Sequence, residues 1–270
     1  MKKLLIVLSG LSLLATCSKD PVTGKSTHNY YSLASDIKLG QQVMASQQKS
    51  LVKSDKKMDM EADAEEYQRI RRIVQRIIPL THVPNFPYES HLADVEVVNA
   101  WCAPGGKIMV YTGLWDKEKG LVTKGDENEL AAVIGHEIAH ATARHVTERL
   151  STITTLQIAG AVASSAIASG GSAQGSDLFN EVFTQGMNVY VPSYSRKAES
   201  EADRLGLIYM AEAGYNPEAA VRLWERAAKK RGDQTSVFAS HPASGERAKA
   251  LKALLPRAME IYQEARKKYR

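Results

Sequence analysis

The stretch VIGHEIAHA (residues 133–141) places three ionisable side chains inside an otherwise uncharged run. Burying such groups in a helix is costly unless they are paired or coordinate a metal. His136 and His140 are four residues apart, so in a helix of 3.6 residues per turn they project from one face. The spacing predicts a helix that offers two imidazoles to one metal ion. The alternative is a surface helix with the same spacing by chance.

Glu137 lies beside the first histidine, where its carboxylate can reach a metal-bound water and act as a general base. This is the H-E-x-x-H pattern of zinc-dependent hydrolases. A catalytic zinc takes three protein ligands and keeps one position for water, so a further ligand is required. His145 follows too early for the short metzincin spacing and lies well round the predicted helix, so we assign it no ligand role.

A second pair at helical spacing occurs in YSRKAESEAD (residues 194–203), where Glu199 and Asp203 are four residues apart. One carboxylate can complete the metal shell. The other can accept a hydrogen bond from a ligand histidine and fix its tautomer. Glu201 points away from this face, and we expect it either to contact the metal ligands without binding the metal itself or to face solvent. The two pairs predict two helices that converge on one ion.

The length and net charge of the chain limit the number of domains and the kinds of partner to expect. A chain of 270 residues suits one sizeable domain, and 35 basic against 30 acidic residues give a net charge of +5. The basic cluster at the C-terminus (266–270) is typical of a solvated helix end. No basic stripe interleaved with aromatic residues occurs elsewhere, so we expect no nucleic-acid partner.

The N-terminus has the features of an export signal. Residues 1–16 contain Lys2-Lys3, an apolar run and small residues, which indicates a signal peptide too short to span a bilayer. Cys17 directly afterwards resembles the lipidated first residue of a bacterial lipoprotein, and Ser18 after it favours the outer membrane by the same resemblance. If Cys17 is not acylated, a Cys17–Cys102 disulfide becomes possible.

The remaining pattern predicts an α+β fold that is predominantly α, with a tether and N-terminal helix over 17–60 and one metallopeptidase domain over 61–270. Residues 151–186 are rich in Ala, Ser and Gly and are too polar for a membrane helix. They indicate closely packed helices followed by a Gly/Ser loop, or a flap over a cleft. The predicted elements are helices over 33–53 and 62–78, strands at Val95–Val98 and Lys107–Tyr111, a turn at Pro104–Gly106, and helices starting near 126, 195, 217 and 244.

Four motifs together carry a family resemblance: NAWCAPGGKIMVYTGL, HEIAH, SRKAESEAD and HPASGER. They are similar to the gluzincin family that includes the CAAX prenyl protease 1 group, HtpX-like quality-control proteases and BepA- and LoiP-like periplasmic proteins. The resemblance covers about residues 60–255. It implies a zincin-like peptidase domain with an active-site helix, one Zn²⁺ per chain, and Glu199 as the third ligand.

The resemblance also implies roles outside the metal ligands. The first motif becomes the substrate-facing edge strand, to which an extended peptide can add by β-augmentation. His241 becomes a residue near the zinc that either blocks the open site or assists the transition state, and Arg247 anchors its loop against Asp203 or a neighbouring carboxylate. We expect the oxyanion of the transition state to be stabilised by zinc, with His241 or Tyr194. The residues expected to bind substrate are Asn99, Ala100, Trp101, Gly105 and Gly106.

These observations lead to one functional expectation and one rival. The first is a zinc metalloendopeptidase that cleaves misfolded or misassembled envelope proteins, acting on unfolded or extended polypeptides. It would be tethered to the periplasmic side of the outer membrane by a lipid on Cys17, or otherwise be soluble in the periplasm. The rival is a non-catalytic or self-inhibited assembly factor that binds unfolded outer-membrane proteins on the same strand edge.

Overall fold

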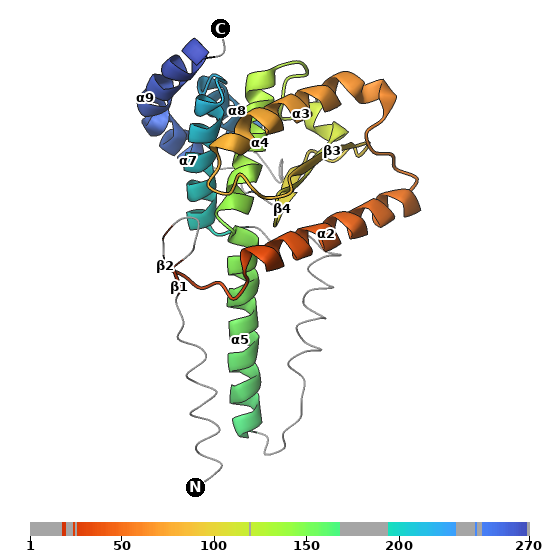
Figure 1. The fold of residues 1–270 in the computed structure, drawn as a ribbon, viewed down its shortest axis with the longest axis vertical. Helices are drawn as coiled ribbons and strands as arrows, with labels where there is room; N and C mark the ends of the chain where they lie inside the picture. The colour runs from red at the N-terminus through yellow and green to blue at the C-terminus, as the bar shows by residue number, and fades with distance from the viewer. Residues whose placement is uncertain are drawn as a thin grey trace.

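The computed structural model describes residues 18–19, 24, 26–118, 120–167, 194–230, 241 and 245–268. Helices surround a small sheet (Figure 1), so the fold is α+β and predominantly α, as predicted. The elements are β1 (Ser18–Lys19), β2 (Ser26–Thr27), α2 (Leu33–Lys53), η2 (Glu61–Asp63), α3 (Ala64–Ile77), η3 (Ile78–Leu80), β3 (Glu89–Ala93), β4 (Ala100–Ala103), β5 (Lys107–Tyr111), η4 (Thr112–Trp115), α4 (Glu127–Thr142), α5 (His145–Ile167), α7 (Arg196–Glu212), α8 (Glu218–Lys230) and α9 (Gly245–Lys268).

The larger sheet has the strand order β3-β5-β4, with β3 parallel and β4 antiparallel to β5. The predicted turn joins β4 to β5: Gly106 N–H donates to Ala103 O at 3.2 Å. Gly105 has φ of 70° at the third turn position, which glycine adopts without steric cost. The outer edge of β3 is partly covered by residues 57–59, whereas β4 ends the sheet within the described ranges.

The predicted strand at Val95–Val98 is wrong, because this segment is the connection between β3 and β4. Val95 N–H turns back to Ala93 O at 2.9 Å, and Val95 O accepts from Gly113 N–H at 2.8 Å. An added Cβ at Gly113 would lie 2.3 Å from the carbonyl of Glu96, so η4 packs directly on this segment. The valine-rich run therefore packs against a helical turn instead of joining the sheet ladder.

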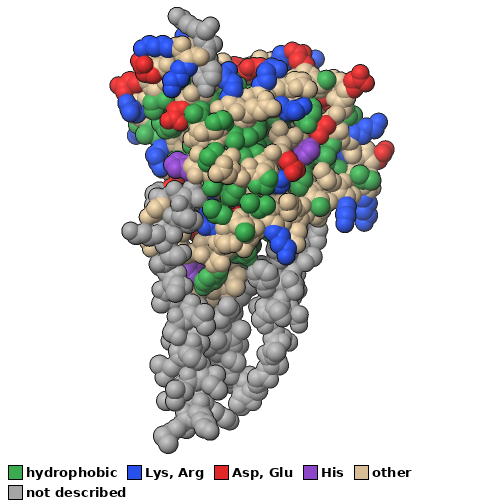
Figure 2. Space-filling model, in the orientation of Figure 1, with side chains coloured by type: hydrophobic (Ala, Val, Ile, Leu, Met, Phe, Trp, Pro, Cys, Tyr) green, Lys and Arg blue, Asp and Glu red, His purple; other side chains and the backbone are tan. Residues whose placement is uncertain are grey.

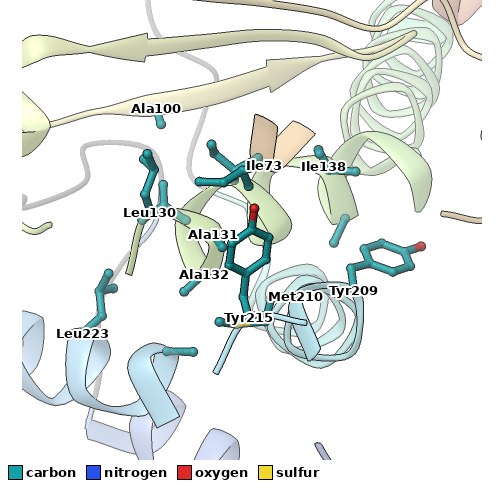
Figure 3. Close-up of a cluster of buried hydrophobic side chains, with 14 of the residues drawn as sticks. Ile73, Ala100, Leu130, Ala131, Ala132, Ile138, Tyr209, Met210, Tyr215 and Leu223 are labelled. Carbon is teal, nitrogen blue, oxygen red and sulfur yellow. The ribbon is translucent and has the colours of Figure 1, made fainter. Parts of the chain in front are cut away.

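Side chains alternate between the two faces of the sheet, and both faces are covered. Ile108 and Val110 of β5 belong to the main core under α3 and α4, whereas Met109 joins a smaller cluster with Met44 and Leu51 of α2. Figure 3 shows the main core around α4, where Ile73 from α3, Ala100 from β4 and Met210 from α7 meet α4 side chains.

α4 is buried on all sides, which explains the uncharged run around its histidines. Asp126 caps it as predicted, accepting from the N–H groups of Asn128 at 2.9 Å and Glu129 at 3.1 Å. From Glu129 to Thr142 every residue is buried, against β4, α3, α7 and α8.

The tightest contact of α4 is with α7. An added Cβ at Gly206 would lie 2.7 Å from the backbone nitrogen of His136, and one at Gly135 would lie 3.0 Å from Gly206 O. Real Cβ atoms do not come within 2.7 Å of a backbone nitrogen, so the two helices can cross at this distance only because Gly206 lacks a side chain. A Cβ at Gly135 would be a tight contact that needs a smaller shift. The crossing brings the start of α7 alongside the H-E-x-x-H face.

α5 follows α4 after a short break and extends beyond the body of the molecule (Figure 1). The break is at Arg144, whose φ is 59°, a conformation that costs a non-glycine residue roughly 1–2 kcal/mol. The Arg144 guanidinium is buried and donates to Asp36 Oδ2 at 2.7 Å and to Tyr31 O, so α2 stabilises the turn.

Residues 28–30 lie along α5, bonded to side chains one helical turn apart. His28 Nε2 contacts Thr155 Oγ1 at 2.6 Å, Asn29 Nδ2 donates to Thr147 Oγ1 at 3.0 Å, and Tyr30 N–H donates to Ser151 Oγ at 2.9 Å. We refer to residues 28–31 as the strap.

On the face seen in Figure 2, acidic and basic side chains are interspersed, and hydrophobic side chains gather near its centre. Within the described ranges, none of the helices combines the length and the apolar character needed to cross a bilayer. Cys17, the Gly170–Gly175 loop and the Pro242–Ser244 stretch lie outside the described residues.

Candidate metal centre

Four buried side chains from three separate segments converge on one point. His136 and His140 come from α4, Glu199 from the first turn of α7, and His241 from the segment before α9. One nitrogen or oxygen from each lies within 4.8 Å of all the others, and this is the group of potential metal ligands found among the described residues. The structure therefore brings the two predicted helical pairs together.

The spacing of the donor atoms fits a tetrahedral ion. Nε2 of His136 is 3.1 Å from Nε2 of His140, and each of these nitrogens is 3.6 Å from an oxygen of Glu199. Ligands about 2.1 Å from a tetrahedral zinc lie about 3.4 Å from one another. Imidazole nitrogens with one carboxylate form a donor set that suits zinc and similar transition metals. The residues present therefore fit a metal ion.

Asp203 supports the first histidine from behind. Its Oδ1 is 3.0 Å from His136 Nδ1, on the opposite side of the ring from the cluster. Burial raises the pKa of Asp203, but hydrogen bonds from Arg247 and His136 outweigh burial and bring it below its ordinary value. The charged carboxylate can thus hold the His136 proton on Nδ1 and leave Nε2 free to bind a metal.

Arg247 connects the carboxylates of α7. It donates to Asp203 through Nε at 2.8 Å and Nη2 at 2.7 Å, and its Nη1 is 2.7 Å from Glu199 Oε2. The guanidinium also stacks on Trp224 of α8, 3.7 Å from the ring centroid. Burial raises the pKa of Glu199, but His136 and His241 outweigh burial and lower it well below the ordinary value. Glu199 is thus an anion with Oε1 turned towards His140 and His241.

Glu137 and His241 face each other beside the cluster. His241 Nε2 is 3.4 Å from Glu137 Oε1, and its Nδ1 is 2.8 Å from Glu199 Oε1. Burial lowers the pKa of His241, but the two carboxylates outweigh burial and raise it to about 9. Glu137 Oε1 is buried and has no hydrogen-bond partner among the described residues, which is the environment expected of a carboxylate that receives a bound water.

His145 lies outside the group of converging donors, but its expected position well round a continuous helix is wrong. α4 ends at Thr142, and the turn at Arg144 sends His145 back against the second histidine, with its Nδ1 2.9 Å from His140 Nδ1. Tyr194 stacks on the other side of the His140 ring, with centroids 3.9 Å apart. Burial and the neighbouring histidines keep the pKa of His140 well below its ordinary value, so this imidazole is neutral.

No pattern in the sequence indicated a place for Trp224 in the site. Its ring contacts the Arg247 guanidinium and also lies against the His136 ring, with 5.7 Å between the two ring centroids. Tryptophan at an apolar helix position is ordinarily read as core. The sequence before His145, Ala-Thr-Ala-Arg, consists mostly of good helix formers and carries no sign of the break at Arg144.

The predicted substrate residues separate into two groups. Asn99, Ala100 and Trp101 lie at the start of β4, which ends the sheet, with Asn99 and Trp101 partly exposed. Gly105 and Gly106 are instead buried in the fold, because an added Cβ would lie 2.6 Å from Ile37 Cα or 2.4 Å from the Tyr88 ring. The structure thus places these two glycines against α2 and Tyr88, not along the outer edge of β4.

β4 lies within electrostatic reach of the cluster. Burial raises the pKa of the Cys102 thiol well above its ordinary value, and the Glu137 carboxylate raises it further. A buried, protonated thiol is a poor nucleophile.

A buried H-E-x-x-H helix joined by a glutamate from a second helix defines the gluzincin class of metallopeptidases. The chain belongs to peptidase family M48, whose family model matches residues 64–255. It is 33% identical to the mitochondrial metalloendopeptidase OMA1 of Schizosaccharomyces pombe over an alignment of 194 residues. This alignment covers 70% of this chain and 53% of that protein. The Escherichia coli metalloproteases LoiP and YcaL are 33% and 30% identical to this chain, each over 156 residues. Each alignment covers 57% of this chain, and the two cover 58% of LoiP and 57% of YcaL. The chain thus spans about half the length of these relatives.

Glu199 and Glu201 can be separated as metal ligands by parallel substitutions to glutamine. Glu199→Gln removes the charge that faces His140, and we expect metal affinity to fall by at least about 100-fold. Glu201 lies outside the group of converging donors, so Glu201→Gln should keep a stoichiometric metal ion. Elemental analysis of both purified variants measures this. Metal retained by Glu199→Gln and lost by Glu201→Gln would reverse the assignment.

Proposed function

We propose that the chain is a zinc metalloendopeptidase, with His136, His140 and Glu199 as zinc ligands and Glu137 as the general base. The observation that carries the proposal is the convergence of His136, His140 and Glu199, buried side chains from two helices, on one point, with Glu137 on the same helix as the two histidines. Membership of peptidase family M48 supports the same chemistry. A zinc ion held there supplies a Lewis acid that polarises the scissile carbonyl and lowers the pKa of a bound water to about 7.

The chain's own residues account for the proton transfers. Glu137 takes a proton from the attacking water and later delivers it to the leaving amine. Its oxygen Oε1 is buried, so little rearrangement of solvent accompanies the transfer. Asp203, held by Arg247, keeps His136 in the tautomer that binds metal. Tyr194 and His241 are the groups near enough to donate to the oxyanion of the tetrahedral intermediate.

An extended polypeptide is the substrate that best fits the outer edge of β4. β4 has its backbone paired on one side by β5, and its outer side can hydrogen-bond to a peptide added as a further strand. This mode of binding uses main-chain groups, so it selects unfolded segments over particular sequences. β4 packs against α4, the helix that carries Glu137.

A self-inhibited resting state is the second candidate, and one observation favours it. His241 lies inside the ligand group with Nδ1 3.3 Å from His136 Nε2, at a distance that suits a fourth ligand. A metal with four protein ligands has no position for water. In this form the protein would bind polypeptide without cleaving it until the His241 ring leaves the metal.

The proposed location is the cell envelope, and it depends on residues 1–17. A signal peptide followed by an acylated Cys17 would tether the peptidase to the outer membrane, where misfolded or misassembled envelope proteins are its substrates. The strap would then join the tether to α5.

The general-base role predicts a separation of metal binding from activity. Glu137→Gln should bind zinc like the wild type while cleavage of unfolded casein falls roughly 10²–10⁴-fold. Glu127→Gln, on the exposed first turn of the same helix, serves as the matched control and should retain activity because its ion pair with Arg72 is on the surface. Substantial casein cleavage by Glu137→Gln would exclude it as the base.

The closed resting state predicts that His241→Ala increases activity. Removing the imidazole opens a coordination position, so casein cleavage should rise several-fold while the zinc content stays stoichiometric. His91→Ala, whose ring pairs with Asp59 at 2.7 Å away from the cluster, is the control and should change nothing. A loss of cleavage with zinc retained would show instead that His241 assists the reaction.

The lipid anchor predicts labelling at one cysteine. In Gram-negative cells grown with labelled palmitate, the wild type and Cys102→Ser should incorporate label and sediment with membranes. Cys17→Ser should lack label and appear in the soluble fraction. Label retained by Cys17→Ser would contradict the anchor.

A further inference from the structure

The second ligand histidine is supported differently from the first. His140 Nε2 faces the cluster, whereas its Nδ1 faces another imidazole, that of His145, at 2.9 Å between the two Nδ1 atoms. Both rings are buried, and their centroids are 4.9 Å apart in an edge-on arrangement. By contrast, His136 is backed by the carboxylate of Asp203.

Two ring nitrogens at this distance share one proton between them. If His140 presents the Nε2 lone pair to a metal, its proton must lie on Nδ1. That N–H then donates to His145, which must accept through the Nδ1 lone pair and carry its own proton on Nε2. The geometry therefore couples the tautomers of the two rings: His145 with its proton on Nδ1 would oppose the metal-binding form of His140.

A carboxylate lies on the far side of His145. Nε2 of His145 is 3.7 Å from Glu201 Oε2, a separation that a small shift or one water can bridge. Both residues line a cavity of about 220 Å³ that also contacts Tyr194 and Lys197. Glu201 thus stands where an anion favours the Nε2–H form of His145. This gives Glu201 a position in the structure distinct from that of Glu199.

We propose that His145 is a positioning residue for the metal centre: it accepts the Nδ1–H of His140 and, with Glu201 behind it, fixes the tautomer that presents His140 Nε2 to the metal. The inference rests on the proposed function of the same site. It assigns His145 a role beyond packing, because an apolar ring of similar size fills the space but leaves the His140 N–H buried without an acceptor.

Zinc affinity of the full exported chain tests the role, measured by competition with a chromogenic chelator. His145→Phe keeps the ring and removes the acceptor, so zinc affinity should fall roughly 10–100-fold. His145→Asn retains a polar atom near the Nδ1 position and should restore affinity close to the wild-type value. His91→Phe, a histidine paired with Asp59 in β3, controls for the loss of any imidazole and should bind zinc normally.

Wild-type affinity in His145→Phe, or equal weakening in His145→Phe and His145→Asn, would overturn the proposal in favour of packing alone. If wild-type protein binds no zinc, the proposed function fails instead, so the two failures are distinguishable.

A spectroscopic measurement on the zinc-loaded wild type covers the case in which His145→Phe does not fold. Long-range ¹H–¹⁵N correlation spectra show which ring nitrogen carries the proton, with the His145 signals assigned by their absence in His145→Asn. The proposal requires a neutral His145 protonated on Nε2. Protonation on Nδ1, or on both nitrogens, would overturn it.

Discussion

The close crossing of α4 and α7 at Gly135 and Gly206 is the constraint on which the site depends. Glu199, Asp203 and Gly206 are spaced so that they share one face of α7, and Gly135 precedes the first histidine of α4. When the two backbones touch, the carboxylates of α7 are therefore carried to the imidazoles. A side chain at Gly206 would separate the helices and move one half of the ligand set away from the other, and one at Gly135 would require a smaller shift.

The charge of the buried cluster indicates what it is built to hold. Glu137, Glu199 and Asp203 are buried carboxylates, and Arg247 is the buried guanidinium that contacts two of them. With all imidazoles in the neutral form that a metal requires, three negative charges and one positive charge leave a net charge of −2. Without a metal, the raised pKa of His241 means that this ring supplies part of the compensating positive charge. Uncompensated charge of this size is costly in a low-dielectric interior, and a divalent cation matches it. The protein thus forms, with its own residues, a site whose charge is balanced when the ion is bound.

Patterns among neighbouring residues were sufficient to predict some features of the site and fold. Other features depend on contacts between residues far apart in the sequence and were predicted wrongly. The two pairs at helical spacing, the Asp126 cap and the Pro104–Gly106 turn depend on neighbouring residues and were predicted from the sequence. The strand at Val95–Val98 was wrong because η4, further along the chain, packs on it. The position of His145 was wrong because Arg144 breaks the helix, and the partner that stabilises that break, Asp36, is 108 residues away. No pattern within a few residues of His145 carries that information.

The strap determines how much of the N-terminus belongs to the folded unit. His28, Asn29 and Tyr30 bond to hydroxyl-bearing side chains of α5, and Tyr31 O accepts from Arg144 next to the metal centre. A recombinant chain that begins at the first turn of α2 would expose that face of α5 and remove one acceptor of the buried guanidinium. Shortened forms of this protein should therefore start ahead of residue 26, although the region resembles a dispensable linker.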